Sequence, residues 1–254
     1  MPHKQPDILL DITMTACRRP EILKQTLNSF FRNMLEPIRD KCRLIINLDP
    51  IGDDIDSESI LPIITAYFKY YHIHFPMNPS FPHAFKWVWD QSEAPWVFHL
   101  EDDWELLQPV DIMAMIQTMQ DYPQLALLRL PHKKSEGNTT KQWNLFFPHN
   151  GRYFVCPPDR IRTAGFAGHP SLIRDKFIHS TRPFLSTEMN PEKQFHGDNY
   201  YIVNEVMNWE YGVWGNPGDP KYIQDIGEQW RVANKFLKGG AANKAFFKVW
   251  EKYS

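Results

Sequence analysis

The stretch Trp96-Val97-Phe98-His99-Leu100-Glu101-Asp102-Asp103-Trp104 joins an apolar run to three consecutive carboxylates. The run predicts a buried strand over 96–100, with the acids at its carboxyl end. Adjacent carboxylates repel one another, which costs stability unless a cation or a donor-rich ligand lies among them. Their oxygens suit Mg²⁺ or Mn²⁺, whose remaining ligands come from phosphates and water. The stretch therefore predicts a ligand site, and the alternative is an acidic loop that only ends a strand.

Strands and helices alternate on both sides of this stretch. Apolar runs predict strands over 8–14, 44–48, 73–75 and 125–130, and helical spacing predicts helices over 21–31, 58–71, 81–91 and 109–119. Alternation of this kind builds right-handed βαβ units and a mostly parallel sheet. Ligand sites in such sheets lie outside the carboxyl ends of the strands, which is where the three acids fall.

The pattern changes after Pro131. Residues 132–151 are polar and rich in Lys, Asn and Thr, which predicts a long loop near a site. Beyond this loop we expect short strands over 153–156 and 211–214 and helices over 171–178 and 199–209.

The composition is that of a folded protein. Hydrophobic residues make up 43% of the 254, which is ample for a packed core and excludes general disorder. The three cysteines are odd in number and widely spaced, which excludes a disulfide framework and a CxxC zinc site and favours a reducing compartment. No apolar run reaches 18 residues, and residues 1–6 lack the apolar segment of a signal peptide. We expect a soluble, cytoplasmic protein without a membrane anchor.

The acidic stretch resembles the DxD region of GT-A glycosyltransferases, in a Glu-Asp-Asp variant. Residues 12–20 resemble the first strand and turn of family 2 type enzymes, and 44–49 resemble their second strand. Residues 78–90 resemble the helix that closes over the nucleotide sugar. The resemblance implies an α/β GT-A (Rossmann-like) fold with a mostly parallel sheet flanked by helices. It implies a single domain over 1–254, in which 1–130 bind the nucleotide sugar and the metal and 131–254 form a looser acceptor-binding and catalytic half.

The resemblance also suggests roles for individual residues. Nucleotide-sugar contacts are expected from Thr15, Ala16, Arg18, Asp49, Lys86, Glu101, Asp102, Arg231 and Lys235. Asp103 is expected to bind Mn²⁺ or Mg²⁺, with Asp102 and His169 as further candidate ligands. An inverting transfer needs a base for the acceptor hydroxyl, and the candidates are Asp198 and then Glu188. Helix caps would equally explain Asp49 and Asp198, solvated charges would explain Arg18, Arg231 and Lys235, and His169 could be structural.

Local charge suggests the acceptor. The whole chain carries a net charge of −2, whereas residues 129–182 carry ten basic and three acidic side chains. Aromatic residues are interspersed among the basic ones there, which suits a phosphate backbone and a stacked or flipped base. The candidate acceptor contacts are Lys133, Lys134, Trp143, Arg160 and Arg162.

Soluble viral and phage glycosyltransferases resemble this layout, and some of them modify hydroxymethylated bases in DNA. We therefore predict a metal-dependent, inverting glycosyltransferase with a possible DNA acceptor, located in the host cytoplasm if the protein is viral. Glycan, lipid or protein hydroxyls are the alternative acceptors. A nucleotidyltransferase or metal nuclease could use the same carboxylates, and a non-catalytic binding module is the third alternative. Nucleotidyltransferases usually open with a glycine-rich loop, and residues 15–19 contain no glycine.

Overall fold

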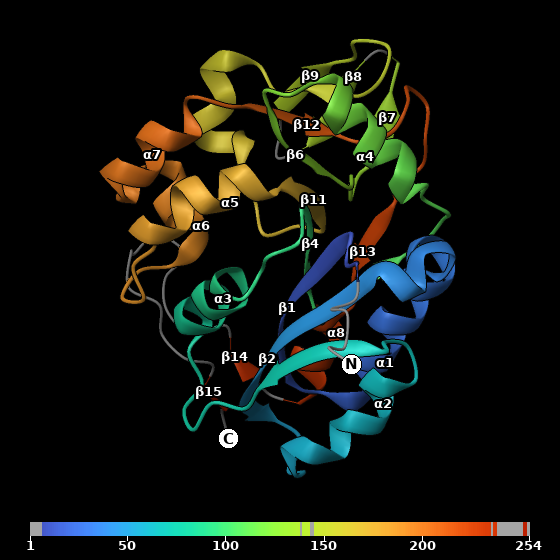
Figure 1. Cartoon of the computed structure of the whole chain (residues 1–254), viewed down its shortest axis with the longest axis vertical. Coiled ribbons are helices and arrows are strands. Elements are labelled where there is room, and N and C mark those ends of the chain that lie inside the picture. Colours follow the sequence, from blue (N-terminus) through green and yellow to red (C-terminus); the bar gives the residue numbers. More distant parts are fainter. Residues whose placement is uncertain (1–6, 138, 143–144, 235, 238–250, 253–254) are drawn as a thin grey trace, which may run out of the picture.

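The computed structural model describes residues 7–137, 139–142, 145–234, 236–237 and 251–252. Its central sheet has eight strands in the order β10-β12-β6-β11-β4-β1-β2-β3 (Figure 1). These strands are β1 (Leu10–Arg18), β2 (Cys42–Gly52), β3 (Tyr70–His74), β4 (Trp96–Glu101), β6 (Leu125–Arg129), β10 (Phe154–Val155), β11 (Ser171–Arg174) and β12 (Glu210–Val213).

Helices cover both faces of this sheet (Figure 1). The α-helices are α1 (Pro20–Phe30), α2 (Leu61–Thr65), α3 (Phe81–Asp90), α4 (Ile112–Asp121), α5 (Asp175–Thr181), α6 (Pro191–Lys193), α7 (Tyr200–Val206) and α8 (Gly227–Ala233). Short 3-10 and π turns are η1 (Phe31–Leu35), η2 (Glu36–Lys41), η3 (Ser57–Ile60), η4 (Pro158–Arg160), η5 (Ile161–Gly165), η6 (Arg182–Phe184) and η7 (Gln194–Asp198). The mostly parallel sheet between helices confirms the predicted α/β class.

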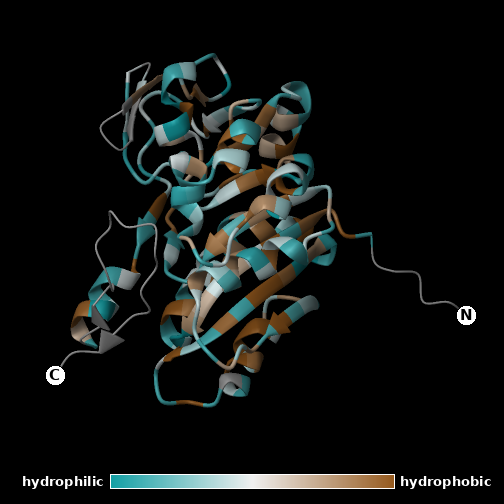
Figure 2. Ribbon diagram, turned by 90° about the vertical axis from the view of Figure 1, so that its left-hand side faces the viewer, coloured by the Kyte–Doolittle hydropathy of each residue, from teal (hydrophilic) through white to brown (hydrophobic). Residues whose placement is uncertain are grey.

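The core is divided by the sheet into two hydrophobic clusters. One cluster packs α1, α2 and α4 on Leu10, Ile12 and Met14 of β1, and the other packs α3, α5 and α7 on Val97 of β4 and Ile173 of β11. Alternate side chains of a strand point to opposite faces, so β4 contributes apolar residues to both clusters, whereas the second face of β1 carries buried polar residues. Figure 2 shows hydrophobic residues along these strands and hydrophilic residues on the outer turns of the helices.

Strand register brings the ends of three parallel strands together. β1 lies between β2 and β4, with Thr15 beside Glu101 and Cys17 beside Asp49. Because parallel strands end at the same edge of a sheet, this register gathers the polar residues of all three ends.

One predicted helix is partly wrong. Residues 171–174 form β11, which pairs antiparallel with both β4 and β6, and the helix begins only at Asp175. Ser171, Leu172 and Ile173 are fully buried in the middle of the sheet, so burial between two strands overrides their local preference. The helix predicted over 58–71 is also shorter, because α2 ends at Thr65 and β3 begins at Tyr70.

The long segment after Pro131 contains structure of its own. It forms a three-stranded antiparallel sheet from β7 (Ser135–Glu136), β8 (Thr139–Gln142) and β9 (Leu145–Pro148). Elsewhere, β5 (Trp104–Leu106) pairs with β13 (Ile223–Asp225), and β14 (Phe236–Leu237) pairs with β15 (Glu251–Lys252). The β5–β13 pair brings the segment before α8 onto the acidic stretch. None of the helices in the described ranges has the length and apolar character needed to cross a bilayer.

Candidate active site

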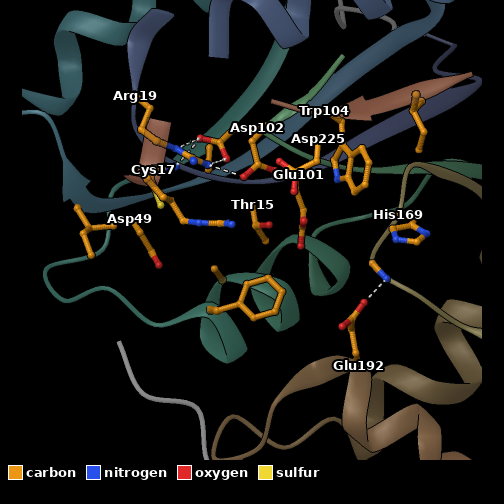
Figure 3. A pocket seen from close by; sticks show the side chains of 18 of the residues that line it. Thr15, Cys17, Arg19, Asp49, Glu101, Asp102, Trp104, His169, Glu192 and Asp225 are labelled. Carbon is orange, nitrogen blue, oxygen red and sulfur yellow. Dashed lines mark hydrogen bonds and ion pairs between the residues drawn. The ribbon is translucent and has the colours of Figure 1, made fainter. Parts of the chain in front are cut away.

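A cavity of about 480 Å³ opens at the carboxyl ends of β1, β2 and β4 (Figure 3). Its lining from the first half of the chain is Thr15, Ala16, Cys17, Arg19, Asp49, Ile51, Pro79, Ser80, Phe81, Ala84, Glu101, Asp102, Asp103 and Trp104. Its lining from the second half is His132, Gly168, His169, Asn190, Glu192, Lys221, Ile223, Gln224, Asp225 and Arg231. Its size and its position at this edge of the sheet are typical of ligand sites in α/β folds.

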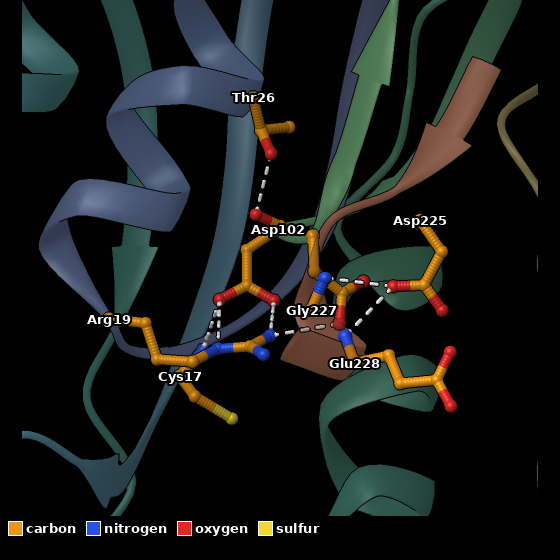
Figure 4. Close-up of polar contacts among 8 residues, drawn as sticks. Cys17, Arg19, Thr26, Asp102, Asp225, Gly227 and Glu228 are labelled. Atoms are coloured by element: carbon orange, nitrogen blue, oxygen red, sulfur yellow. Dashed lines mark hydrogen bonds and ion pairs between the residues drawn. The ribbon is translucent and has the colours of Figure 1, made fainter. Parts of the chain in front are cut away.

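Asp102 is held by a buried arginine (Figure 4). Arg19 Nη2 and Nε donate to the two carboxylate oxygens of Asp102, the latter bond measuring 3.2 Å, and the Cys17 amide donates to Oδ2 at 3.0 Å. Thr26 Oγ1 donates to the Asp102 carbonyl at 2.6 Å. Burial alone would lower the pKa of Arg19, but the charges of Asp102 and Asp103 hold it above its ordinary value. Asp102 is therefore an anchoring carboxylate with both oxygens engaged.

Asp103 lies between Arg19 and the segment that leads into α8. Arg19 Nη2 donates to Asp103 Oδ2 at 3.2 Å, and the Ile226 amide donates to the Asp103 carbonyl at 2.9 Å. Gly227 packs directly on this side chain, and a Cβ there would collide with the Asp103 carboxylate. Burial raises the pKa of Asp103, Asp102 and Asp225 add to the rise, and Arg19 opposes it.

Two carboxylates of this region fit a divalent cation. Asp225 accepts the amides of Gly227 and Glu228 through Oδ1, and no hydrogen bond among the described residues reaches Asp225 Oδ2 or Asp103 Oδ1. Asp103 is close enough to Asp102 and Asp225 for their negative charges to act on it, and Arg19 opposes them. Mg²⁺ and Mn²⁺ need only one or two protein carboxylates when phosphates complete the shell. Asp103 and Asp225 fit that requirement.

The predicted ligand set of Asp103, Asp102 and His169 is not assembled. No group of three or more His, Cys, Asp or Glu side chains is placed to hold a metal in the part of the chain that the structure describes. Asp102 is engaged by Arg19, and the His169 ring packs 5.2 Å from that of Trp104 and 4.7 Å from that of His132. Burial lowers the pKa of His169, and it lowers that of His132 to about 4, so both rings are neutral at neutral pH.

Asp49 closes the other end of the cavity. Its carboxylate accepts Asn47 Nδ2 at 2.8 Å and the Ser80 amide, just before α3, at 3.0 Å. Burial raises the pKa of Asp49 to about 6, although both hydrogen bonds favour the charged form. Asp49 therefore changes its charge close to physiological pH.

A second pair of carboxylates, Glu101 and Glu192, flanks Gly168, and Glu192 lies across the cavity from Arg19 (Figure 3). Glu192 on α6 accepts the Gly168 amide at 2.6 Å. A Cβ at Gly168 would lie 3.0 Å from Glu192 Oε1 and 3.4 Å from Glu101 Oε1, so both carboxylates flank this glycine. The missing side chain lets the backbone pass between them. Trp104 adds an indole N–H that has no hydrogen-bond partner among the described residues.

The structure places the predicted donor residues unequally. Thr15, Ala16, Asp49, Glu101, Asp102 and Arg231 line the cavity. Arg18 does not, because its guanidinium donates to the Pro50 and Ile55 carbonyls at 2.9 Å. Lys86 forms an ion pair with Asp90 on α3 at 2.9 Å, and Lys235 lies outside the described residues.

The predicted catalytic and acceptor residues lie away from the cavity lining. Asp198 and Glu188 are exposed and do not line the cavity. Lys133, Lys134, Arg160 and Arg162 are exposed cations, and Trp143 lies outside the described residues. Residues that sequence reasoning missed are Cys17, Arg19, Trp104, Asn190, Glu192, Lys221 and Asp225. Of these, only Glu192 lies in a stretch whose sequence predicts a local structure. Asn190-Pro191-Glu192 has the cap and the proline typical of a helix start, and the Asn190 side chain accepts a hydrogen bond from the Lys193 amide.

No protein-family model and no curated protein sequence matches the chain. Among solved structures, it resembles S. aureus TarS 1–349 with a TM-score of 0.61 and 10% identity, over 90% of this chain and 64% of that one. The complex of TarS 1–349 with UDP-GlcNAc matches with a TM-score of 0.56 and 12% identity, over 85% of this chain and 58% of that one. Mannosyltransferase PcManGT from Pyrobaculum calidifontis, in complex with GDP-Man and Mn²⁺, matches with a TM-score of 0.50 and 11% identity, over 91% of this chain and 64% of that one.

At this level of identity the likeness shows the fold alone. The chain has the GT-A-type, Rossmann-like fold that the acidic stretch predicted. It spans less than two thirds of the length of each of these solved chains.

Proposed function

We propose that this chain is a glycosyltransferase that moves a sugar from a nucleoside-diphosphate sugar to an acceptor hydroxyl. The observation that carries the proposal is the position of Asp102 and Asp103 on a GT-A-type fold, where Arg19 orders them at the edge of a 480 Å³ cavity. The solved neighbours bind UDP-GlcNAc, or GDP-Man with Mn²⁺, on the same fold.

The donor end of the cavity is suited to a diphosphate. Asp103 and Asp225 would hold Mn²⁺ or Mg²⁺, which supplies positive charge to the leaving nucleoside diphosphate. Lys221 and Arg231 also line the cavity and would contact the phosphates. Positive charge beside a leaving group lowers the activation barrier of the transfer, because negative charge develops on the leaving group in the transition state.

We expect Asp49 to accept an N–H group of the nucleobase, and this predicts a pH dependence of donor binding. The pKa of Asp49 is raised to about 6, so the carboxylate is charged above pH 6 and protonated below it. Donor affinity should therefore fall below pH 6, by about tenfold for each further pH unit. Calorimetric titrations between pH 5 and 7.5 would measure it. Asp49→Asn should bind weakly at every pH, and an unchanged pH profile in that variant would contradict the role of Asp49.

The acceptor hydroxyl needs a base on the opposite side of the sugar from the diphosphate. We assign this role to Glu192, because it lines the wall opposite Arg19, in place of Asp198 and Glu188. The Gly168 amide holds one oxygen of Glu192 in position. Direct attack by a hydroxyl deprotonated there would invert the anomeric carbon, as expected from the sequence.

The experiment that tests the function measures nucleotide release from UDP- and GDP-sugars in the presence of Mn²⁺. We expect slow hydrolysis of one donor, with water as the acceptor. Glu192→Gln should lower its kcat by about 10²–10⁴-fold and leave the donor Kd unchanged. Glu36→Gln, a matched change at an exposed site on η2, should behave like the wild type. Failure of every donor to bind would refute the proposal, and full turnover by Glu192→Gln would refute the assignment of the base.

The sequence suggested a hydroxymethylated base in DNA as the acceptor. The support for it is the net charge of residues 129–182 and the exposure of Lys133, Lys134, Arg160 and Arg162. The binding of duplex DNA with and without hydroxymethylated bases is the direct comparison for this acceptor.

A further inference from the structure

Three aromatic side chains form an exposed platform at the beginning of α7. Tyr200 is 73% exposed, Tyr201 63% and Phe184 41%. The rings of Phe184 and Tyr201 stack, with centroids 5.5 Å apart and an interplanar angle of 16°, and Tyr200 meets Tyr201 edge to face at 5.8 Å. Large aromatic rings gathered in solvent lose the benefit of burial, so an exposed cluster of this kind marks an interaction surface.

The platform is held by a polar network. Asn199, which caps α7, donates through Nδ2 to the Phe184 carbonyl at 2.8 Å and to Gln194 Oε1 at 3.1 Å. Gln194 is fully buried and bonds both the amide and the carbonyl of Ser186, at 2.8 and 2.9 Å. On the other side, Arg182 of η6 donates to the Trp89 carbonyl at the end of α3 at 3.3 Å. The rings are therefore presented by a braced turn.

Residues 190–194, which include Gln194, also form part of the cavity wall. Asn190 and Glu192 line the cavity, and Gln194, which braces the platform, follows two residues after Glu192. The platform is thus tied through Gln194 to the side of the cavity where we place the acceptor hydroxyl.

The charge around the platform selects among acceptors. Residues 184–206 contain four acidic side chains, Glu188, Glu192, Asp198 and Glu205, and one basic side chain, Lys193. Three basic side chains from other segments lie nearby: Arg162, with Nη2 3.3 Å from the Cβ position of Gly197, Arg182, which braces the platform, and Lys86, which is paired with Asp90 and donates to the Arg182 carbonyl. Acidic side chains are therefore not outnumbered by basic ones around the platform. A phosphate backbone needs an excess of positive charge, whereas a neutral sugar ring presents an apolar C–H face to an aromatic ring and hydroxyls to the surrounding polar groups.

We propose that Phe184, Tyr200 and Tyr201 bind a neutral glycan, and that this glycan is the acceptor. The inference rests on the proposed sugar transfer and specifies its acceptor class as a hexopyranose chain with no charge of its own. The tyrosines provide stacking faces, and their hydroxyls can bond the sugar, as expected of aromatic residues with one apolar and one polar end.

The test measures glycan binding and donor hydrolysis separately. The probes are maltotriose, cellotriose and triacetylchitotriose, with binding followed by saturation-transfer NMR and calorimetry. We expect at least one probe to bind the wild type, and the Tyr200→Ala/Tyr201→Ala double variant to bind it at least about tenfold more weakly. Hydrolysis of the nucleotide sugar should be unchanged in that variant. Tyr71→Ala, at an exposed tyrosine of β3, is the matched control and should bind like the wild type.

Each outcome bears on a separate claim. Lack of binding by all three probes, or equal binding by the double variant, would overturn the platform as a glycan site. Binding of hydroxymethylated duplex DNA that depends on Tyr200 and Tyr201 would overturn it in favour of a nucleic-acid acceptor. Glycan binding on the platform in a protein that hydrolyses no nucleotide sugar would refute the sugar transfer and leave the glycan site standing.

Discussion

Replacing Arg19 by methionine should lower the free energy of unfolding by about 3–5 kcal/mol. Arg19 is only 2% exposed, and its guanidinium is bonded to Asp102 (Figure 4) and also to Asp103. Its removal leaves two buried carboxylates facing each other without the cation that balances them. The guanidinium also lies 5.3 Å from the centroid of the Trp230 ring on α8, so this contact between Arg19 and α8 is lost as well.

Denaturant unfolding followed by circular dichroism would measure this loss. Arg18→Met is the matched control and should cost less, about 1–2 kcal/mol, because the hydrogen bonds of its side chain within the described ranges go only to the Pro50 and Ile55 carbonyls. Combining Arg19→Met with Asp102→Asn should recover part of the stability, since the second change removes an uncompensated charge. An Arg19→Met protein as stable as the Arg18→Met protein would contradict the role of the ion pair.

Asp103→Asn should lower turnover of the nucleotide sugar by about 10²–10³-fold and weaken Mn²⁺ binding. Asparagine keeps the shape of the side chain and so preserves the packing against Gly227. It removes the negative charge that we expect to hold the cation. Calorimetric titration with Mn²⁺ gives a readout that is independent of activity, and the expected result is a large rise in the Kd for the metal.

Asp102→Asn, at the neighbouring carboxylate, is the comparison for Asp103→Asn. Both Asp102 oxygens accept hydrogen bonds from Arg19, so this change should reduce stability more than Asp103→Asn does and weaken the metal less. Asp225→Asn should weaken Mn²⁺ binding as Asp103→Asn does. If Asp102→Asn abolished metal binding and Asp103→Asn left it intact, the assignment of the metal ligand would be wrong.

Much of the fold could be predicted because its central elements have strong local patterns. The apolar runs of β1, β2, β4 and β6 are long enough to be recognised, and their order with α1, α3 and α4 implies a parallel sheet. β11 could not be predicted, because its four residues adjoin a helix and become a strand only between β4 and β6. Its antiparallel course brings His169 and Gly168 to the cavity.

The candidate site was predictable where it lies on strand ends and unpredictable elsewhere. Glu101, Asp102, Asp103, Thr15 and Asp49 reach the cavity because parallel strands end together. Glu192, Asp225 and Lys221 come from short segments in the second half, where local patterns say little about which side chain turns inward.

By itself, the sequence determined the α/β class, the position of the acids at the end of β4 and the edge of the sheet where the cavity opens. These features depend on the periodicity of apolar residues and on the common direction of parallel strands, which are local properties. Only the tertiary structure decided that Arg19 and not its neighbour Arg18 meets the acids, and that Glu192 faces the cavity while Asp198 does not. Residues of the same type that are close in sequence, at a strand end or in a short turn, can point their side chains in different directions, and the local sequence pattern does not distinguish them. Long-range packing alone selects which one reaches the cavity.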